Sequence, residues 1–304
     1  MDPLGVLRSW AVQDSPPGAA TAALVARVPD LPVGWLEDAI ARREVVALYT
    51  TRTATAVVPA GEAAAFGAAQ LPPQEDELTA AVEEVAAALD GRSLRRDDLH
   101  EELRRRLPPA LLPWCEGCRK HHARRALLVR AGLHGKLCIA GRAGRQPLFA
   151  RTDQIVGWDP PDDAGAELVC RYHAQYGASS RQSFTAWSGL ETAHAKALWS
   201  DGAGEPERLP GVALLAPGDP ILLTRDREAL VPDPGMRRKL WTAIPTTGLV
   251  TEDGAPVALW KAKKAGPRLV VTVDGDADLD AVRARAEALA PHRGARAVEV
   301  TAAT

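Results

Sequence analysis

The sequence has few cysteines and no long run of apolar residues. Cys115, Cys118, Cys138 and Cys170 are its only cysteines, and they are too few and too unevenly spaced for a disulfide framework. No apolar stretch reaches the roughly 18 residues of a membrane span, and Met1 is not followed by the segments of a signal peptide. These absences exclude a disulfide-stabilised secreted scaffold and a membrane protein. We therefore expect a cytoplasmic protein with free thiols and no membrane partner.

Low-complexity segments and strict short repeats are also absent. The chain instead carries 24 prolines and 25 glycines, which predict many short elements joined by tight connections rather than long helices. A length of 304 residues exceeds what a single hydrophobic core usually fills. We therefore expect more than one domain.

A net charge of −2 hides a strong asymmetry along the chain. Residues 92–151 contain 15 of the 37 Lys and Arg residues but only 5 of the 39 Asp and Glu residues, a balance of +10. The rest of the chain is therefore acidic. A cationic module in an acidic protein is the electrostatic pattern of a polyanion-binding element. The alternative is a basic face that is merely solvated.

The first region, residues 1–72, is predicted to contain two helices and a strand. We expect the helices over residues 19–28 and 33–42. A short apolar run, followed by a threonine-rich polar segment, predicts a buried strand over residues 45–51 that enters a hairpin. The proline-rich segment LPPQED then links this region to the next.

Residues 73–159 carry the positive charge. We predict a helix over residues 77–89, a second helix for which Ser93 is the N-cap, and a third over residues 120–131. The segment GKLCIAGRAGRQPLFART predicts two strands joined by a tip rich in Gly and Arg. Three helices followed by a basic hairpin are the plan of a winged-helix unit. In such a unit a helix enters a DNA groove, and the hairpin reaches the backbone or minor groove.

Residues 160–209 show a similar succession of predicted helices but lack the excess of positive charge. We predict helices over residues 164–176 and 190–199, with the serines of SSRQSF capping a helix between them, and interpret the region as a third winged-helix-like unit used for packing. Residues 210–304 are predicted to be β-rich, with GVALLAP, ILLTRD, GLVTEDGAPVALWKAK and RLVVTVDG separated by turn signals. The predicted fold class is α+β, with tandem winged-helix units and a β-rich C-terminal part.

The segment CEGCRKHH carries four potential metal ligands, Cys115, Cys118, His121 and His122. A C-x2-C pair followed by a histidine resembles half of a zinc site. Adjacent histidines on a helix, however, point about 100° apart, and Cys138 is the nearest other candidate ligand. We therefore expect no metal site here. The alternative interpretation is a loop with two half-buried thiols and two histidines that add positive charge below neutral pH.

Basic residues cluster at the predicted hairpin tip and on the helix before it. At the tip, Gly141 and Gly144 would let Arg142 and Arg145 follow phosphates or enter a minor groove. Arginines on a turn are common, but together with the preceding basic residues they favour DNA binding. Those residues are Arg119, Lys120, Arg124 and Arg125. The eight tryptophans lie singly, mostly among apolar neighbours, and are expected to be core anchors rather than stacking platforms for bases.

Six segments occur in a defined order along the chain. They are AVQDSPPGAATAALVARV, EVVALYTTRTATAVVPA, WCEGCRKHHARRALLVRAGL, AELVCRYHAQYGASSRQSFTAWSGL, LLAPGDPILLTRDREALVPD and GLVTEDGAPVALWK. In this order they resemble segments of the AlkZ/YcaQ-type winged-helix DNA-binding proteins, over nearly the whole chain. The resemblance implies tandem winged-helix units and a β-rich part arranged around duplex DNA. It also implies a monofunctional DNA glycosylase that removes bulky N7-alkylated purines and can unhook crosslinks.

The resemblance further implies catalytic residues. The family's chemistry is assigned to a Gln-x-Gln or Gln-x-Asp motif that positions a water or stabilises the sugar as the base departs. The motif aligns with Ala11-Val12-Gln13, so its second polar residue is kept and its first is alanine, with Asp14 directly after it as a substitute carboxylate. Relatives also tend to carry an arginine followed four residues later by histidine. Here Arg52 is kept, and Ala56 stands where the histidine would be.

The leading hypothesis is a DNA glycosylase that acts on alkylated purines in double-stranded DNA, as a monomer and without a metal or other cofactor. Gln13 would orient the water, Asp14 would assist, and Arg52 would contact the sugar-phosphate near the lesion. An N7-alkylpurine is already cationic, so its departure needs a polarised water and electrostatic support more than an acid. A structural alternative is that Gln13 or Asp14 caps the helix after Gly18 or holds a turn.

Two other functions remain open. A non-catalytic DNA-binding or regulatory protein on the same scaffold is favoured by the alanines at positions 11 and 56. A third hypothesis is a zinc-dependent interaction module centred on Cys115 and Cys118.

Overall fold

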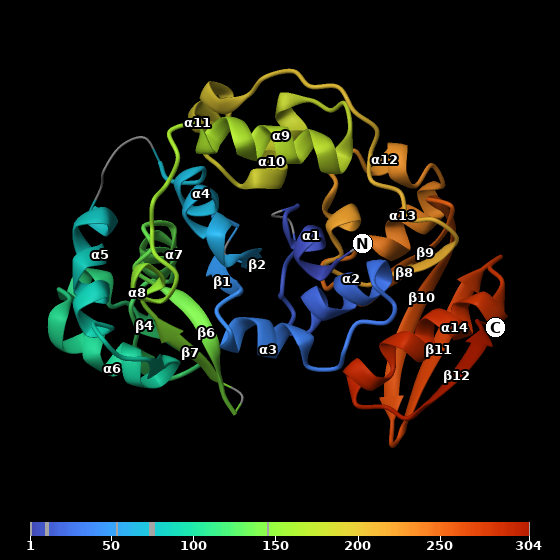
Figure 1. Cartoon of the computed structure of the whole chain (residues 1–304), viewed down its shortest axis with the longest axis horizontal. Helices are drawn as coiled ribbons and strands as arrows, with labels where there is room; N and C mark the ends of the chain where they lie inside the picture. Colours follow the sequence, from blue (N-terminus) through green and yellow to red (C-terminus); the bar gives the residue numbers. More distant parts are fainter. Residues whose placement is uncertain (1, 10–11, 53, 73–76, 145, 304) are drawn as a thin grey trace. The chain divides into compact units, whose positions relative to one another are not determined.

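Two compact units make up the computed structural model, which describes residues 2–9, 12–52, 54–72, 77–144 and 146–303. Unit 1 comprises Met1–Trp35, Arg171–Trp187 and Asp201–Thr304, and unit 2 comprises Leu36–Cys170 and Ser188–Ser200. Each unit has its own five-stranded sheet (Figure 1). The mixture of helices and sheets confirms the predicted α+β class. The four-part division of the chain stays a prediction.

The sheet of unit 2 has the strand order β2-β1-β6-β7-β3. β1 (Val45–Tyr49) and β2 (Thr55–Pro59) form one antiparallel hairpin, and β6 (Cys138–Ala143) and β7 (Gln146–Ala150) form another. β3 (Leu94–Arg95) pairs with β7 at the edge. The strand predicted after residue 45 and the predicted hairpin with the basic tip are both confirmed.

Three helices pack together beside this sheet. They are α5 (Glu77–Ala88), α6 (Arg96–Arg106) and α7 (Arg125–Leu133) (Figure 1). Apart from a 3-10 helix and a small two-stranded hairpin between α6 and α7, the order along the chain is helix, short strand, helix, helix, hairpin. Their shared core is apolar because each helix turns one leucine- or valine-bearing face inward. Fully buried members are Val85, Leu99, Leu103, Leu127 and Phe149. The remaining helices that lie wholly or partly in unit 2 are α3 (Trp35–Ala41), α4 (Ala63–Ala68), α8 (Thr152–Ile155), α9 (Ala164–Tyr176), α10 (Arg181–Ser188) and α11 (Thr192–Leu198).

Two predictions in this module are wrong. Ser93 does not cap α6, because Leu94 and Arg95 pair with β7 and the helix begins only at Arg96, with Arg95 at the N-cap. Residues 120–124 are not helical either. Lys120–His121 forms β5, which pairs with β4 (Trp114–Cys115) in a small hairpin, and α7 starts at Arg125. In both places a strand partner supplies hydrogen bonds that the first turn of a helix leaves unmade.

Trp158 fills a space that two glycines of unit 2 leave open. A Cβ added at Gly67 in α4 would lie 2.6 Å from the indole, and one at Gly135, just after α7, would lie 2.3 Å from it. Gly135 also has a φ of +72°, a conformation that other residues rarely adopt. The indole therefore packs directly on bare backbone and ties the chain after β7 to α4 and to the end of α7.

The sheet of unit 1 has the order β12-β11-β10-β9-β8. β8 (Val212–Leu215), β9 (Gly248–Glu252), β10 (Ala255–Ala265) and β11 (Arg268–Gly275) are antiparallel neighbours. β12 (Ala297–Ala302) instead runs parallel to β11. The predicted β-rich C-terminal part is confirmed.

Helices cover the sheet of unit 1. α14 (Leu279–Leu289) connects β11 to β12 and lies against the sheet (Figure 1), and α2 (Ala19–Arg27) packs on both β8 and α14. The strand predicted at ILLTRD is wrong, because Pro220–Leu223 forms a 3-10 helix that starts where the Asp219 carboxylate accepts from the Ile221 N–H. The other short helices are α1 (Pro3–Leu7), α12 (Arg227–Leu230) and α13 (Pro234–Leu240).

Several smaller predictions about caps and aromatic residues are confirmed. Ser180 accepts a hydrogen bond from the Ser183 N–H at 3.1 Å at the start of α10, so a serine caps this helix. The prediction that tryptophans are core anchors holds for Trp187 and Trp260, which are 4% and 3% exposed. Trp158, Trp199 and Trp241 are only partly buried, and Trp114 is half exposed on β4. Among the residues that the structure describes, no helix has the length and apolar character that crossing a bilayer requires.

Candidate functional site

Gln13 lies in unit 1 before α2 and is only 7% exposed. Its amide nitrogen Nε2 is buried and has no hydrogen-bond partner among the described residues. An unpaired buried donor costs about 1–3 kcal/mol, so it needs a water, an ion or a ligand to satisfy it. The predicted catalytic glutamine therefore holds an unused N–H donor in an enclosed position.

Asp14 has a different environment. Its Oδ1 accepts from the backbone N–H of Gly18 at 2.6 Å and of Ala20 at 3.4 Å. Gly18 is the N-cap residue of α2 and has no side chain to offer, so Asp14 satisfies amides that the start of the helix leaves free. The capping alternative therefore holds for Asp14 and not for Gln13. Ala11, the other motif position, lies outside the described residues.

Arg52 follows β1 in unit 2, next to an anchored backbone segment. The Thr51 hydroxyl donates to the Ser188 carbonyl at 2.6 Å, and the Thr51 N–H donates to Gln70 Oε1 at 3.3 Å. Gly189 comes so close that a Cβ there would lie 2.6 Å from Arg52 Cγ. The arginine stem is therefore confined. No sequence pattern pointed to Gln70, which is 5% exposed and lies 19 residues away.

Ala56, at the position where the resemblance places a histidine, is fully buried in β2 opposite Leu48. Its methyl group fills an interior position of unit 2. An imidazole at this place would need both a larger space and a hydrogen-bond partner. The neighbourhood of residue 56 is thus built for a small apolar side chain.

Three of the predicted DNA contacts are exposed cations without a salt bridge to any described residue: Arg119, Lys120 and Arg124. Their predicted common placement on one helix is wrong. Arg119 and Lys120 lie on the β4–β5 hairpin, and Arg124 is the N-cap residue of α7. Cations without a carboxylate partner are the ones that can neutralise phosphates at the smallest cost.

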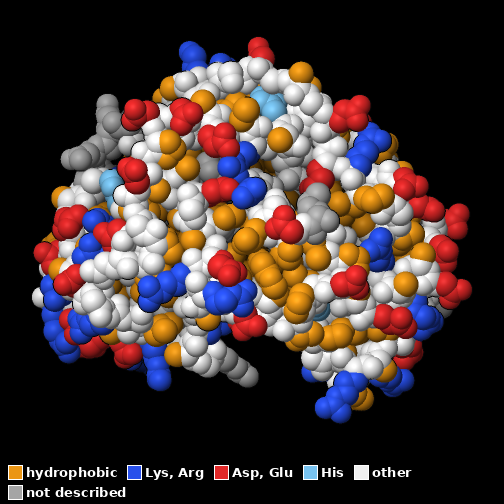
Figure 2. Space-filling model, in the orientation of Figure 1, with side chains coloured by type: hydrophobic (Ala, Val, Ile, Leu, Met, Phe, Trp, Pro, Cys, Tyr) orange, Lys and Arg blue, Asp and Glu red, His pale blue; other side chains and the backbone are white. Residues whose placement is uncertain are grey.

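The arginines at the end of α6 are neutralised within their own helix. Arg105 lies 3.2 Å from Glu101 and 3.3 Å from Glu102, and Arg104 also pairs with Glu101. Over α6, Figure 2 shows Lys and Arg side chains interspersed with Asp and Glu. Such exposed pairs add little stability. They do reduce the positive charge that this part of the module offers to a polyanion.

The remaining predicted contacts lie on α7 and on the basic hairpin. Arg125 opens α7, and its guanidinium carbon lies 5.4 Å from the centroid of the Tyr49 ring, a cation–π contact. Arg142 is exposed in β6 beside Gly141, which has a φ of +146°. Arg145 lies outside the described residues.

An arginine-lined hollow of unit 1 was not expected from the sequence. A cavity of about 740 Å³ is lined by residues of α12 and α13. Its cations are Arg225, Arg227, Arg237 and Arg238, with Trp241 at its wall. The Arg227 guanidinium carbon lies 5.0 Å from the Trp241 ring centroid. The signal in the sequence is the pair of basic clusters TRDR and MRRK, separated by a few residues.

One arginine of unit 1 is fully enclosed by carboxylates. Arg27, with a side chain 2% exposed, pairs with Asp219 at 2.9 Å and with Glu207 at 2.8 Å. Gln175 also donates to Glu207, at 2.5 Å. Burial alone would raise the pKa of Glu207, but the hydrogen bonds and charge of Arg27 outweigh it, so this pKa lies below its usual value.

Comparisons with known proteins agree with the resemblance drawn from the sequence. The model of a family described as DNA glycosylase AlkZ-like matches residues 6–292. A solved structure, Streptomyces sahachiroi DNA glycosylase AlkZ, is similar with a TM-score of 0.66 and 18% sequence identity, covering 98% of each chain. No curated protein matches the chain. At this identity the structural likeness concerns the fold alone.

Proposed function

Because the chain belongs to the AlkZ-like DNA glycosylase family, we propose that it hydrolyses the N-glycosyl bond of bulky N7-alkylated purines in double-stranded DNA. Double-stranded DNA is then its partner, and the chemistry needs no metal. The observation that carries the proposal is the enclosed, unpaired Nε2 of Gln13.

The reaction needs little from the protein beyond position and polarity. When the C1′–N9 bond breaks, its electron pair moves to N9 and neutralises the cationic N7-alkylpurine. The sugar becomes an oxocarbenium ion. A water oxygen then attacks C1′ and loses one proton to solvent, which leaves an abasic site and the free alkylated base. A neutral amide can orient such a water by donating through nitrogen and accepting through oxygen.

Gln13 fits this task better than Asp14 does. Its Nε2 is buried without a partner among the described residues, so a water or a sugar oxygen next to it would gain a hydrogen bond in a place of low polarity. The Asp14 carboxylate is already held by the Gly18 and Ala20 amides. We therefore assign water orientation to Gln13, and to Asp14 the support of the chain that carries it.

DNA would be held through phosphates. Apart from the η2 turn (Pro109–Leu111) and the β4–β5 hairpin, residues 77–150 follow the order helix, strand, helix, helix, hairpin that is expected of a winged-helix unit, and this supports the proposal that unit 2 binds duplex DNA. Arg119, Lys120, Arg124, Arg125 and Arg142 are the proposed phosphate contacts. Arg52, confined by Gly189, is the proposed contact to the sugar-phosphate near the lesion.

Base release from a duplex containing one bulky N7-alkylguanine tests the proposal. The purified protein is expected to release the base, and Gln13→Ala to lower the rate at least about 100-fold, the usual scale for loss of a positioned catalytic group. Gln182→Ala is the matched control, because it removes an exposed glutamine of unit 1 and should leave the rate unchanged. Release by Gln13→Ala at the wild-type rate would refute the assignment.

The second candidate is a DNA-binding protein without catalysis. The buried alanine at position 56 and the Asp14 carboxylate, which is occupied with backbone amides, favour it. In the same assay this protein would release no base, while salt-sensitive binding to duplex DNA would persist in both the wild type and Gln13→Ala.

A further inference from the structure

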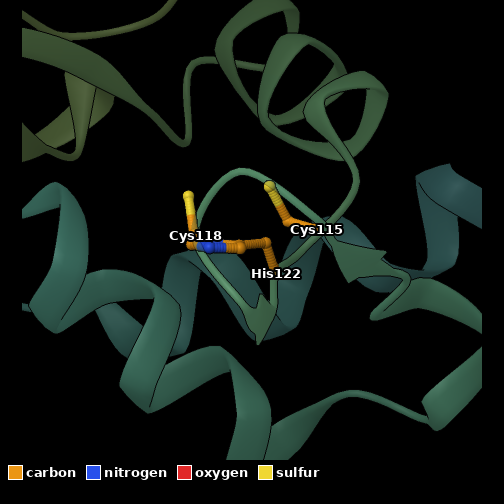
Figure 3. Close-up of side chains that lie close together, drawn as sticks. All are labelled: Cys115, Cys118 and His122. Carbon is orange, nitrogen blue, oxygen red and sulfur yellow. The ribbon is translucent and has the colours of Figure 1, made fainter.

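The β4–β5 hairpin of unit 2 brings three metal-ligating side chains together. Ligand atoms of Cys115, Cys118 and His122 all lie within 4.8 Å of one another, and Figure 3 shows the three side chains gathered at the hairpin. Bond lengths of about 2.3 Å for Zn–S and 2.0–2.1 Å for Zn–N put the ligand atoms of a tetrahedral site about 3.5–3.8 Å apart. Small side-chain rotations would close the difference.

We propose that this cluster binds one zinc ion through the sulfurs of Cys115 and Cys118 and an imidazole nitrogen of His122. The site is distinct from the residues assigned to base release, and the proposal does not depend on them. Two thiolates and one neutral imidazole are donors that zinc prefers, and a water would take the fourth position of the tetrahedron.

The two neighbouring histidines have different roles because this segment is extended rather than helical. Adjacent residues of an extended chain point to opposite sides. His121 turns away from the cysteines, since its Nδ1 lies 2.7 Å from the Leu112 carbonyl and its ring packs edge-on against Trp114. His122 is left to face the cysteines. The two histidines diverge in this extended segment as they would on a helix, so only one of them, His122, can be a ligand.

His122 has an unused nitrogen at this position. Its Nε2 is buried and has no hydrogen-bond partner among the described residues. The ring is oriented by His100 of α6, whose centroid lies 4.5 Å away at an interplanar angle of 87°. The Nδ1 of His100 is also buried without a described partner. A metal ion would satisfy one of these two atoms directly.

The turn between the cysteines points backbone donors at one of the two sulfurs. The amides of Cys118 and Gly117 hydrogen-bond the sulfur of Cys115. The Arg119 N–H donates to the Cys115 carbonyl at 2.7 Å, and Arg119 itself has a φ of +53°. On zinc binding both thiols lose their protons to solvent, and the two negative charges balance the ion.

A zinc ion would also explain how so small a hairpin is held. β4 and β5 have two residues each, and an isolated pair of such short strands is marginal in water. Arg119 and Lys120 lie on this hairpin, next in sequence to the ligands. Fixing the hairpin fixes the backbone of two phosphate-binding candidates, which gives the metal a structural role.

A redox disulfide between the two cysteines is the competing use of a C-x2-C pair. It leaves His122 without a function, and the buried Nε2 without a partner. The metal accounts for all three side chains, so zinc is the proposal, and the disulfide is an outcome of the test.

Metal content of the full-length protein, purified without a histidine tag or chelator, is the test. Elemental analysis should give close to one zinc per chain in the wild type and in Cys170→Ser, which removes an exposed thiol of α9. Cys115→Ser and His122→Gln should contain none after the same desalting. Zinc retained in both ligand variants would overturn the proposal, as would a wild type that takes up none when zinc is supplied.

A second measurement on the wild type covers the case in which the ligand variants fail to fold. A thiol-specific mercurial, added in steps, should release the zinc as two thiols react. A metal-sensitive dye measures the released zinc. Cobalt(II) exchanged into the site should show the visible bands of tetrahedral thiolate coordination. An intact mass lower by two hydrogen atoms in the fresh protein, with no metal released, would identify a disulfide and refute the zinc site.

Discussion

The two units use arginine in opposite ways. In unit 1, Arg27 is enclosed with Asp219 and Glu207 and connects α2 to segments far along the chain. In unit 2, Arg119 and Arg124 are exposed and have no salt bridge with a described residue. The comparison teaches that an arginine's role is set by the carboxylates folded against it. A buried arginine with two partners is part of the structure, and an exposed one without carboxylate partners is available to a ligand.

Removing the buried charge should have the largest effect. Arg27→Met leaves Asp219, whose side chain is fully buried, without its cation, and breaking such a pair typically costs about 3–5 kcal/mol. Unfolding in urea, followed by circular dichroism, should show this decrease in stability. Arg124→Met is the matched control and should stay within about 0.5 kcal/mol of the wild type. Equal destabilisation of the two variants would contradict the conclusion that the buried arginine stabilises the fold and the exposed one does not.

The exposed cations should govern DNA binding instead. The triple variant Arg119→Ala, Lys120→Ala and Arg124→Ala should bind every duplex more weakly. The slope of log K against log salt should become shallower by about 0.9 for each phosphate that the variant no longer neutralises. Fluorescence anisotropy at several salt concentrations measures it, and Arg142→Ala extends the series to the β6–β7 hairpin.

The matched control is Arg105→Ala, because Arg105 has carboxylate partners in its own helix. Its slope should stay close to that of the wild type. The decisive comparison is between the change in salt slope caused by Arg105→Ala and one third of the change caused by the triple variant. If the two are equal, DNA binding depends on net charge alone and not on whether a cation has a carboxylate partner.

The smallest expected effect concerns Asp14. Asp14→Ala should destabilise unit 1 by about 1 kcal/mol, because the amides of Gly18 and Ala20 lose their acceptor. Asp14→Asn keeps an oxygen at the same place and should recover much of this stability in a thermal melt. Base release should follow stability in both variants. Full stability with abolished release in Asp14→Asn would instead place the carboxylate in the chemistry.

Elements with a strong local signal were predictable from the sequence. The apolar run at residue 45 and the Gly-rich tip of the β6–β7 hairpin each specify their structure within about ten residues. The helix predicted over residues 120–131 failed at its start because a C-x2-C turn and a strand partner captured residues 114–121. Local helix propensity is a weak prior when tertiary pairing competes with it.

Contacts between residues far apart in the sequence were not predictable. Arg27 lies 180 residues before Glu207 and 192 before Asp219, so no local pattern marks it as buried. The same holds for the contact of Thr51 with Gln70. At the candidate site, Gln13 was found through the resemblance, but its unpaired Nε2 became apparent only in the folded chain.

The packing of Trp158 on Gly67 and Gly135 restricts how this protein can vary. Any side chain at either glycine would overlap the indole, and at Gly135 it would also meet an unfavourable φ. A smaller residue at position 158 would remove the overlap with the indole, but a Cβ at Gly67 would still lie 2.6 Å from the Leu133 carbonyl oxygen, and one at Gly135 would still meet the unfavourable φ. Substitutions at these three positions, far apart in the sequence, therefore depend on one another. An exposed arginine such as Arg124 can be replaced by itself without a packing conflict.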